Sequence, residues 1–155
     1  AYLIVAGFPA EERKTLDDYR RWADRLNAAG RVAREAGAWV GFHNHADDHK
    51  VAGGGTTGYD LLVERTDPAV VRHQLDTGNA AMAGLDPVAY ADRYGDRYWS
   101  FHVKDVPRLG AEHDTELGRG VIDFRRLLSR VPRLAEKHLF VEQESYPGAP
   151  MDSVR

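Results

Sequence analysis

Residues 70–76 read Val-Val-Arg-His-Gln-Leu-Asp, and this stretch decides how the rest of the chain is interpreted. It is a β-rich, mostly apolar run that ends on Asp76, which predicts a buried strand with a carboxylate at its end. Similar apolar runs lead into His43, His102 and Glu142. The four side chains follow one another at intervals of 33, 26 and 40 residues. This spacing is typical of repeated strand–helix units.

Strands and helices are expected to alternate along the whole chain. Strands are predicted at residues 2–6, 39–42, 70–76, 98–104 and 139–142. Helices are predicted at about 16–36 and 57–65, from Pro87 onward, at about 124–130, and as a first turn at 151–155. The expected helix caps are Thr15, Asp86 and Asp123, with Gly37 ending the first helix. Residues 52–58, Ala-Gly-Gly-Gly-Thr-Thr-Gly, are expected to form a flexible loop.

This alternation fits two architectures. Near-continuous apolar strands indicate a parallel sheet with helices outside, as either an open doubly wound sheet or part of a (β/α)8 barrel. Polar side chains at the ends of successive strands favour the barrel, where enzymes place their chemistry. A nucleotide-binding sheet would carry a Gly-rich turn after its first strand, and the sequence shows none. We therefore predict an α/β fold, a partial (β/α)8 TIM barrel, as a single domain over residues 1–155.

Composition narrows the possible partners. The chain is 43% hydrophobic and 29% charged, with a formal net charge of −3 and no basic stripe, so a nucleic-acid partner is not expected. No run approaches the length of apolar sequence that spans a membrane, and no secretory leader is visible. We expect a cytoplasmic protein.

There are no cysteines, so a metal would be held by His, Asp and Glu, a ligand set that suits Mn, Mg, Co or Zn.

The strand ends are predicted to gather polar groups on one face. Because strand side chains alternate in direction, residues two apart share a face. The shared face would hold His43, His45, Gln74, Asp76, His102, Lys104, Glu142 and Glu144. Burying so many polar groups without mutual pairing or a metal would be costly. The hypothesis is that His43, Asp76, His102 and Glu142 bind one divalent cation, and the alternative is a hydrogen-bonded barrel rim.

Several motifs make the resemblance to a known family specific. HNHAD, LDTGNAAMAGLDPVAY, GDRYWSFHVKD, ELGRGVIDF and FVEQE occur in this order. With them the chain resembles the C-terminal part of the xylose-isomerase-like barrel superfamily, the sugar phosphate isomerases/epimerases, in a branch that carries HNH. The resemblance implies that the strands present are the fourth to the eighth. It also implies a barrel fragment that lacks its N-terminal strands and the end of its last helix.

The resemblance also implies ligands. Members of the superfamily bind one divalent metal through Glu, Asp, His and Glu at the ends of their last four strands. Asp76, His102 and Glu142 match three of these positions, whereas His43 stands where a Glu is usual and is interpreted as a substituted ligand.

Two further positions are compared with the ketose epimerases of the superfamily. Asn79 stands where those enzymes carry a His, and Arg108 follows His102 by six residues, where they have an Arg that contacts substrate. Both are expected to bind substrate.

The implied reaction is isomerisation or epimerisation of a sugar or sugar-derived hydroxy-carbonyl substrate through an enediolate. Glu142 is the first candidate for the base, with His45 or Lys104 next; Lys104 could equally be structural, paired with Asp105 or another carboxylate. The alternatives are a dehydratase or glycoside-type lyase on the same scaffold and a catalytically silent carbohydrate-binding barrel. An apurinic-site endonuclease would need more ligands and a basic face.

Two expectations concern the surface. Four histidines fit no ligand position and are predicted to lie at the surface: His49, His73, His113 and His138. Five parallel strands with open edges would expose unpaired backbone groups, which favours association between copies of the chain.

Overall fold

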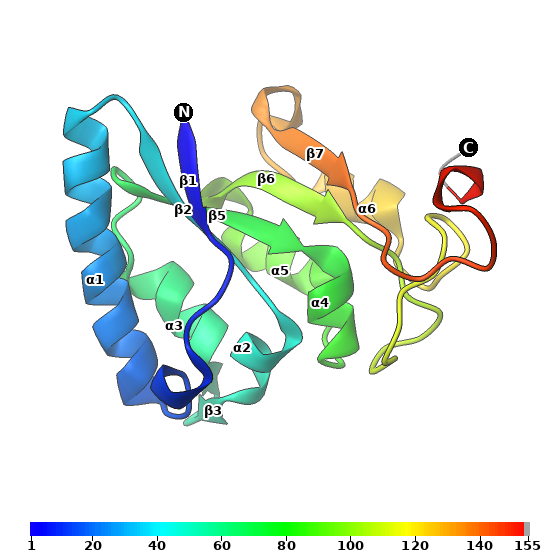
Figure 1. The fold of residues 1–155 in the computed structure, drawn as a ribbon, viewed down its shortest axis with the longest axis horizontal. Coiled ribbons are helices and arrows are strands. Elements are labelled where there is room, and N and C mark those ends of the chain that lie inside the picture. The colour runs from blue at the N-terminus through cyan, green and yellow to red at the C-terminus, as the bar shows by residue number, and fades with distance from the viewer. Residues whose placement is uncertain (154–155) are drawn as a thin grey trace. The chain divides into compact units, whose positions relative to one another are not determined.

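The computed structural model describes residues 1–153, and the fold is α/β as predicted (Figure 1). The sheet order is β1-β2-β5-β6-β7. These strands are β1 (Tyr2–Val5), β2 (Trp39–His43), β5 (Val71–Asp76), β6 (Tyr98–Val103) and β7 (His138–Val141). The pairs β1–β2, β2–β5 and β6–β7 are parallel, as in a TIM barrel. The chain divides into two compact units, Ala1–Gln74 and Leu75 onward, which are described in turn.

In the first unit, a long helix covers the strands. The helix α1 (Leu16–Glu35) begins at Thr15, whose hydroxyl accepts a hydrogen bond from Asp18 N while the Asp18 carboxylate accepts one from Thr15 N. It packs against α3 (Gly58–Arg65) and β2 (Figure 1). A Cβ at Gly30 would lie 2.7 Å from the carbonyl oxygen of Val70, so glycine permits the close approach of α1 to this segment. The prediction of this helix and of its cap is confirmed.

The glycine-rich stretch, predicted as a loop, forms a short hairpin. After a 3-10 turn at Ala10–Glu12 and α1, the chain forms α2 (Ala46–Lys50) and a short hairpin of β3 (Ala52–Gly53) and β4 (Thr56–Thr57). Gly54 and Gly55 have φ angles of 59° and 83°, a left-handed pair that suits a two-residue hairpin turn. The loop predicted at 52–58 is therefore a two-stranded hairpin that leads into α3.

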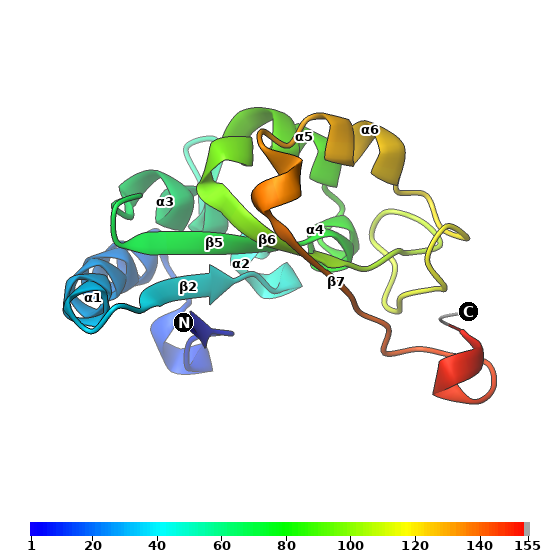
Figure 2. The ribbon, with the colours of Figure 1, turned by 90° about the horizontal axis from the view of Figure 1, so that it is seen from above.

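In the second unit, a helix follows β5 directly, whereas a long loop follows β6. The helix α4 (Thr77–Met82), which sequence reasoning missed, starts directly after β5. It is followed by α5 (Pro87–Tyr94), a 3-10 turn at Gly95–Arg97, and β6. A long loop, residues 104–123, leads to α6 (Phe124–Ser129), which packs against α5 (Figure 2). Further 3-10 turns lie at Leu134–Glu136 and Pro150–Asp152. The predicted caps Asp86 and Asp123 accept from Val88 N and Arg126 N. The helical turn predicted at 151–155 lies partly outside the described residues.

Two of the four histidines predicted at the surface are buried. His73 Nε2 lies 2.8 Å from Thr66 Oγ1, and its ring packs edge-on against Phe42 and Tyr59. His49 Nε2 lies 3.0 Å from Asn44 Nδ2. Both imidazoles pack against the ring of Tyr59 inside the first unit, which explains their burial. The prediction was wrong for these two and is confirmed for His113 and His138, which are exposed.

Two of the predicted strands are exposed in part or throughout. Leu3 and Ile4 of β1 are 60% and 43% exposed. All four residues of β7 are exposed as well. These strands end the sheet order, so each has a neighbouring strand on one side only. An apolar run in a sequence predicts a strand but does not tell an edge from a centre.

Candidate functional site

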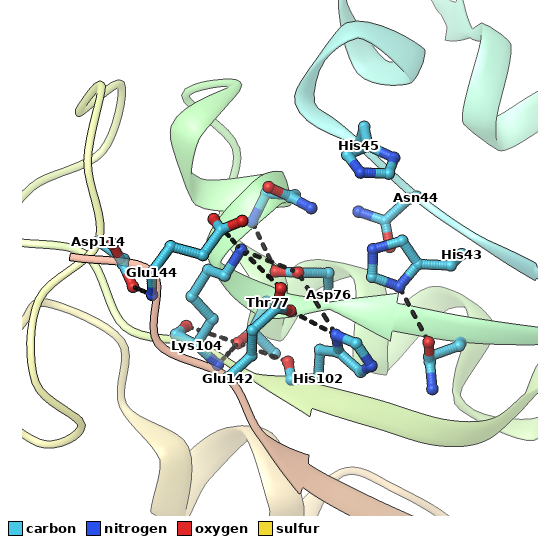
Figure 3. Close-up of polar contacts among 12 residues, drawn as sticks. His43, Asn44, His45, Asp76, Thr77, His102, Lys104, Asp114, Glu142 and Glu144 are labelled. Carbon is cyan, nitrogen blue, oxygen red and sulfur yellow. Dashed lines mark hydrogen bonds and ion pairs between the residues drawn. The ribbon is translucent and has the colours of Figure 1, made fainter. Parts of the chain in front are cut away.

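Four charged or titratable side chains meet in the second unit at the ends of three strands. Asp76 ends β5, His102 and Lys104 lie at the end of β6, and Glu142 follows β7 (Figure 3). His102 Nδ1 contacts Glu142 Oε2 and lies 3.9 Å from Asp76 Oδ2. Lys104 Nζ lies 3.4 Å from both Asp76 Oδ2 and Glu142 Oε1. We call Asp76, His102, Lys104 and Glu142 the strand-end cluster.

Lys104 is the buried cation of this cluster. The residue is only 1% exposed, and its Nζ donates to Glu144 Oε2 at 2.8 Å. Its stem passes directly over Gly78 in the first turn of α4, where a Cβ would lie 2.4 Å from Lys104 Cγ. Thr77 fixes the backbone here, since Lys104 N donates to Thr77 Oγ1 at 3.0 Å. Glycine and threonine at the start of α4 thus make room for the lysine.

Burial and charge shift the ionisation of the cluster. Burial raises the pKa of Asp76 to about 7, although the charge of Lys104 opposes this shift. The hydrogen bond from His102 is the main cause that lowers the pKa of Glu142 to about 2. Burial alone would lower the pKa of Lys104, but the charge of Asp76 and the bond to Glu144 outweigh it and raise that pKa. Lys104 is therefore an ammonium at neutral pH.

The donor set suits a divalent cation. Asp76, His102 and Glu142 offer carboxylate and imidazole donors, the ligands that Mn, Co and Zn take in proteins. Lys104 is a single positive charge beside the carboxylates of Asp76, Glu142 and Glu144. Further positive charge at this position would relieve their mutual repulsion. The residues present thus fit the metal that the sequence predicts.

The first unit holds the other two predicted histidines. His43, the last residue of β2, is buried, and its Nδ1 lies 2.9 Å from Gln74 Oε1 (Figure 3). This contact with an amide oxygen makes Nδ1 the donor and leaves the lone pair of the ring on Nε2, the arrangement typical of a metal-binding histidine. His45 is not on the strand, because it precedes α2 as the helix cap. The predicted common strand face was wrong for His45, although the two rings lie 5.0 Å apart, edge to face.

The two residues predicted to bind substrate have different surroundings. Asn79, in α4, is 8% exposed, and its backbone N donates to Asp76 Oδ1 at 2.8 Å. Arg108 is exposed, and its guanidinium contacts the carbonyl oxygens of Leu109 and Gly110 in its own loop. Within the second unit, Asn79 thus lies beside the strand-end cluster, whereas Arg108 lies on the surface of the loop.

Asp105 and Asp114 have contacts that the sequence did not predict. Sequence reasoning paired Lys104 with Asp105 as one option, but Lys104 contacts Asp76, Glu142 and Glu144, while Asp105 binds backbone amides of the loop 104–123. The alternation of strand side chains does place Lys104 and Asp105 on opposite faces, and this signal was available. Asp114, which contacts the segment after β7, carries no such signal.

The comparisons with known proteins identify the family. The family model of the xylose isomerase-like TIM barrel matches residues 1–154. The chain belongs to this family. The predicted superfamily and the partial barrel are confirmed by this match and by the fold.

Among the described residues, no helix is long and apolar enough to cross a membrane.

Relatives within the xylose isomerase-like family are enzymes. An inosose dehydratase of Lacticaseibacillus casei is 32% identical over 151 residues, which covers 86% of this chain and 50% of that protein. The chain thus spans about half the length of this curated relative.

Solved structures support the fold. A sugar phosphate isomerase/epimerase from Parabacteroides distasonis has a TM-score of 0.79 and 28% identity, over 98% of this chain and 54% of that one. The IOLI protein, solved with a bound zinc atom, has a TM-score of 0.64 and 16% identity, over 92% of this chain and 53% of that one. At that identity the likeness shows the fold alone.

Proposed function

We propose that this protein is a divalent-metal-dependent dehydratase that acts on an inosose or a similar sugar-derived hydroxy-ketone. The observation that carries the proposal is the strand-end cluster of Asp76, His102, Lys104 and Glu142. The name of the Lacticaseibacillus casei relative supports dehydration, which the sequence offered as the alternative to isomerisation.

We propose Asp76, His102 and Glu142 as metal ligands, with His43 as the fourth. One observation supports His43: its Nδ1 contacts Gln74 Oε1, which leaves Nε2 as the ligand atom. Two carboxylates with two imidazoles would neutralise a divalent cation. The zinc atom in the structure of the IOLI protein is compatible with this ligand set, and metal analysis of the purified protein identifies the ion.

The proposed reaction is removal of water from a hydroxy-ketone. A bound divalent cation would act as a Lewis acid toward the substrate carbonyl. A base takes the proton from the carbon beside the carbonyl, the electron pair of that bond forms a C=C bond, and the C–O bond at the next carbon breaks. The departing oxygen takes up a proton and leaves as water. Glu142 remains the first candidate for the base and His45 the second.

Lys104 has another role in this proposal. Before a cation binds, its raised pKa keeps it protonated at neutral pH, so we assign it a charge-pairing role and leave the base to Glu142 or His45. Its ammonium holds the carboxylates of Asp76 and Glu142 in place and contributes positive charge where negative charge develops. Asn79 and Arg108 remain proposed substrate contacts.

Metal analysis and an assay with an inosose test the proposal. We expect the purified protein to retain a divalent metal and to convert the inosose to an unsaturated ketone. Glu142→Gln should lower kcat/KM at least about 100-fold, since it changes a ligand and the candidate base. Glu136→Gln is the matched control, because Glu136 is exposed and pairs with Arg133 away from the cluster. A protein that retains no divalent metal would contradict the proposal.

Isomerisation or epimerisation is the second candidate function. It is favoured by the Parabacteroides distasonis structure, which is 28% identical and bears that name. All these reactions begin by removing the same type of proton, and they differ in what happens next. Product analysis by NMR in D2O separates them: elimination gives a new C=C bond, whereas epimerisation returns deuterium to the original carbon. Metal binding without turnover of any hydroxy-ketone would indicate a carbohydrate-binding barrel.

A further inference from the structure

The loop after β6 is folded around one buried carboxylate. Asp105 Oδ1 accepts from Val106 N at 2.9 Å and from Ile122 N at 3.2 Å. Its Oδ2 accepts from Gly118 N and Gly120 N, both at 3.0 Å. A Cβ at Gly120 would lie 2.2 Å from Asp105 Oδ1, so glycine is required for this approach. Four backbone amides thus converge on one side chain and give a long loop a defined shape.

This loop reaches the segment after β7 through Asp114. Asp114 is only 6% exposed, and its Oδ2 accepts a hydrogen bond from Glu144 N at 2.6 Å (Figure 3). A bond from a backbone amide to an ionised carboxylate is among the stronger hydrogen bonds in proteins. The side chain of Glu144 in turn accepts from Lys104 Nζ. The loop therefore fixes the backbone of a residue that contacts the strand-end cluster.

Glu142 lies between two backbone attachments. On one side, its own amide donates to Val103 O at 3.3 Å, which continues the pairing of β7 with β6. On the other side, two residues later, Glu144 N is bound by Asp114. The exposed strand β7 offers little packing of its own, since all four of its residues are exposed. The position of the Glu142 carboxylate thus depends on both attachments.

We propose that Asp114 is a positioning residue for the candidate metal centre. By binding Glu144 N, it holds the Glu142 carboxylate against His102 and the Glu144 carboxylate against Lys104. The contact that Asp114 makes here is with the backbone amide of Glu144 and not with the side chain of a proposed ligand. This inference rests on the proposed function, because it assigns Glu142 as a ligand.

Cobalt binding tests this role without an activity assay. Co²⁺ is titrated into metal-free full chain, and visible absorption reports both affinity and ligand geometry. Asp114→Ala should weaken Co²⁺ binding about 10- to 100-fold, as loss of outer contacts to ligands does elsewhere. Its spectrum should shift toward that of Glu142→Gln. Asp114→Asn keeps an acceptor oxygen without the charge, and it should weaken binding only about threefold.

The matched control is Asp123→Ala, which removes a carboxylate of the same unit that caps α6 instead. It should leave the Co²⁺ affinity and spectrum unchanged. If Asp114→Ala folds and binds Co²⁺ as the unchanged protein does, the positioning role is overturned. If Asp114→Ala does not fold, Asp114→Asn decides, and an affinity equal to that of the unchanged protein overturns the proposal. Absence of Co²⁺ binding by the unchanged protein would overturn the metal centre itself, and the positioning role with it.

Discussion

At the scale of the residue, Gly78 shows how a missing side chain makes room for a buried charge. A Cβ at Gly78 would lie 2.4 Å from Lys104 Cγ and 2.5 Å from Lys104 Cδ. We therefore expect Gly78→Ala to lower the free energy of unfolding by about 1–3 kcal/mol, because Lys104 has to move from its carboxylate partners. Urea denaturation measures this change. Gly148→Ala is the control, since nothing lies within 4 Å of its Cβ position. Equal effects of the two substitutions would contradict the interpretation.

His49 gives a second prediction at this scale, for acid stability. Burial lowers the pKa of His49 from 6.5 to about 4. The imidazole of His49 binds a proton near pH 6.5 in the unfolded chain but only near pH 4 in the folded protein. The folded state therefore keeps its full stability with respect to this group above pH 6.5 and loses stability as the pH falls from 6.5 to 4. The loss amounts to roughly 3 kcal/mol at most. Urea denaturation at pH 7 and pH 4.5 should show a smaller difference for His49→Gln, and an unchanged difference would refute the assignment.

At the scale of the element, α1 depends on its first turn. Thr15 Oγ1 accepts from Asp18 N, and Asp18 Oδ2 accepts from Thr15 N at 2.8 Å. Thr15→Ala should therefore lower the free energy of unfolding by about 1 kcal/mol. Thr15→Ser should lower it much less, because serine keeps the capping hydroxyl. Denaturation followed by circular dichroism checks both variants. If serine and alanine are equally destabilising, the hydroxyl is not the source of the effect.

The elements that could be predicted are those with local signals. Thr15, Asp86 and Asp123 all cap the helices expected of them, because capping depends on residues three or fewer apart. The helix α4 was missed because Asp76 both ends β5 and caps α4, so no loop separates the two. The role of Asp114 was missed because its partner, Glu144, lies 30 residues away. Such contacts depend on tertiary structure and leave no local pattern.

At the scale of the whole molecule, the ordered motifs predicted the family and the barrel-type fold, and both are confirmed. Asp76, His102 and Glu142 could be predicted to converge, because parallel strands present their carboxyl ends at one edge. Burial could not be predicted in the same way. Leu3 in β1 and Phe140 in β7 occur in apolar runs like those of the central strands, yet both are exposed.

Exposed apolar strands predict self-association of the chain. Leu139, Phe140 and Val141 of β7 are 45%, 48% and 57% exposed, on a strand that ends the sheet order. Such an edge favours pairing with another copy. We expect light scattering to show a mass that rises with protein concentration, and Phe140→Lys to reduce this rise. A monomer over the whole concentration range would contradict the prediction.

The carboxylate of Asp76 couples two neighbourhoods of the second unit, because its oxygens have different partners. Oδ1 accepts from Asn79 N at 2.8 Å in the first turn of α4, while Oδ2 lies 3.4 Å from Lys104 Nζ. An acceptor that shares its charge with a cation holds an amide hydrogen less firmly. When more positive charge lies at Asp76 Oδ2, the Asn79 amide should therefore take up deuterium faster. Hydrogen exchange at this amide of α4 thus reports how much positive charge lies beside the Asp76 carboxylate.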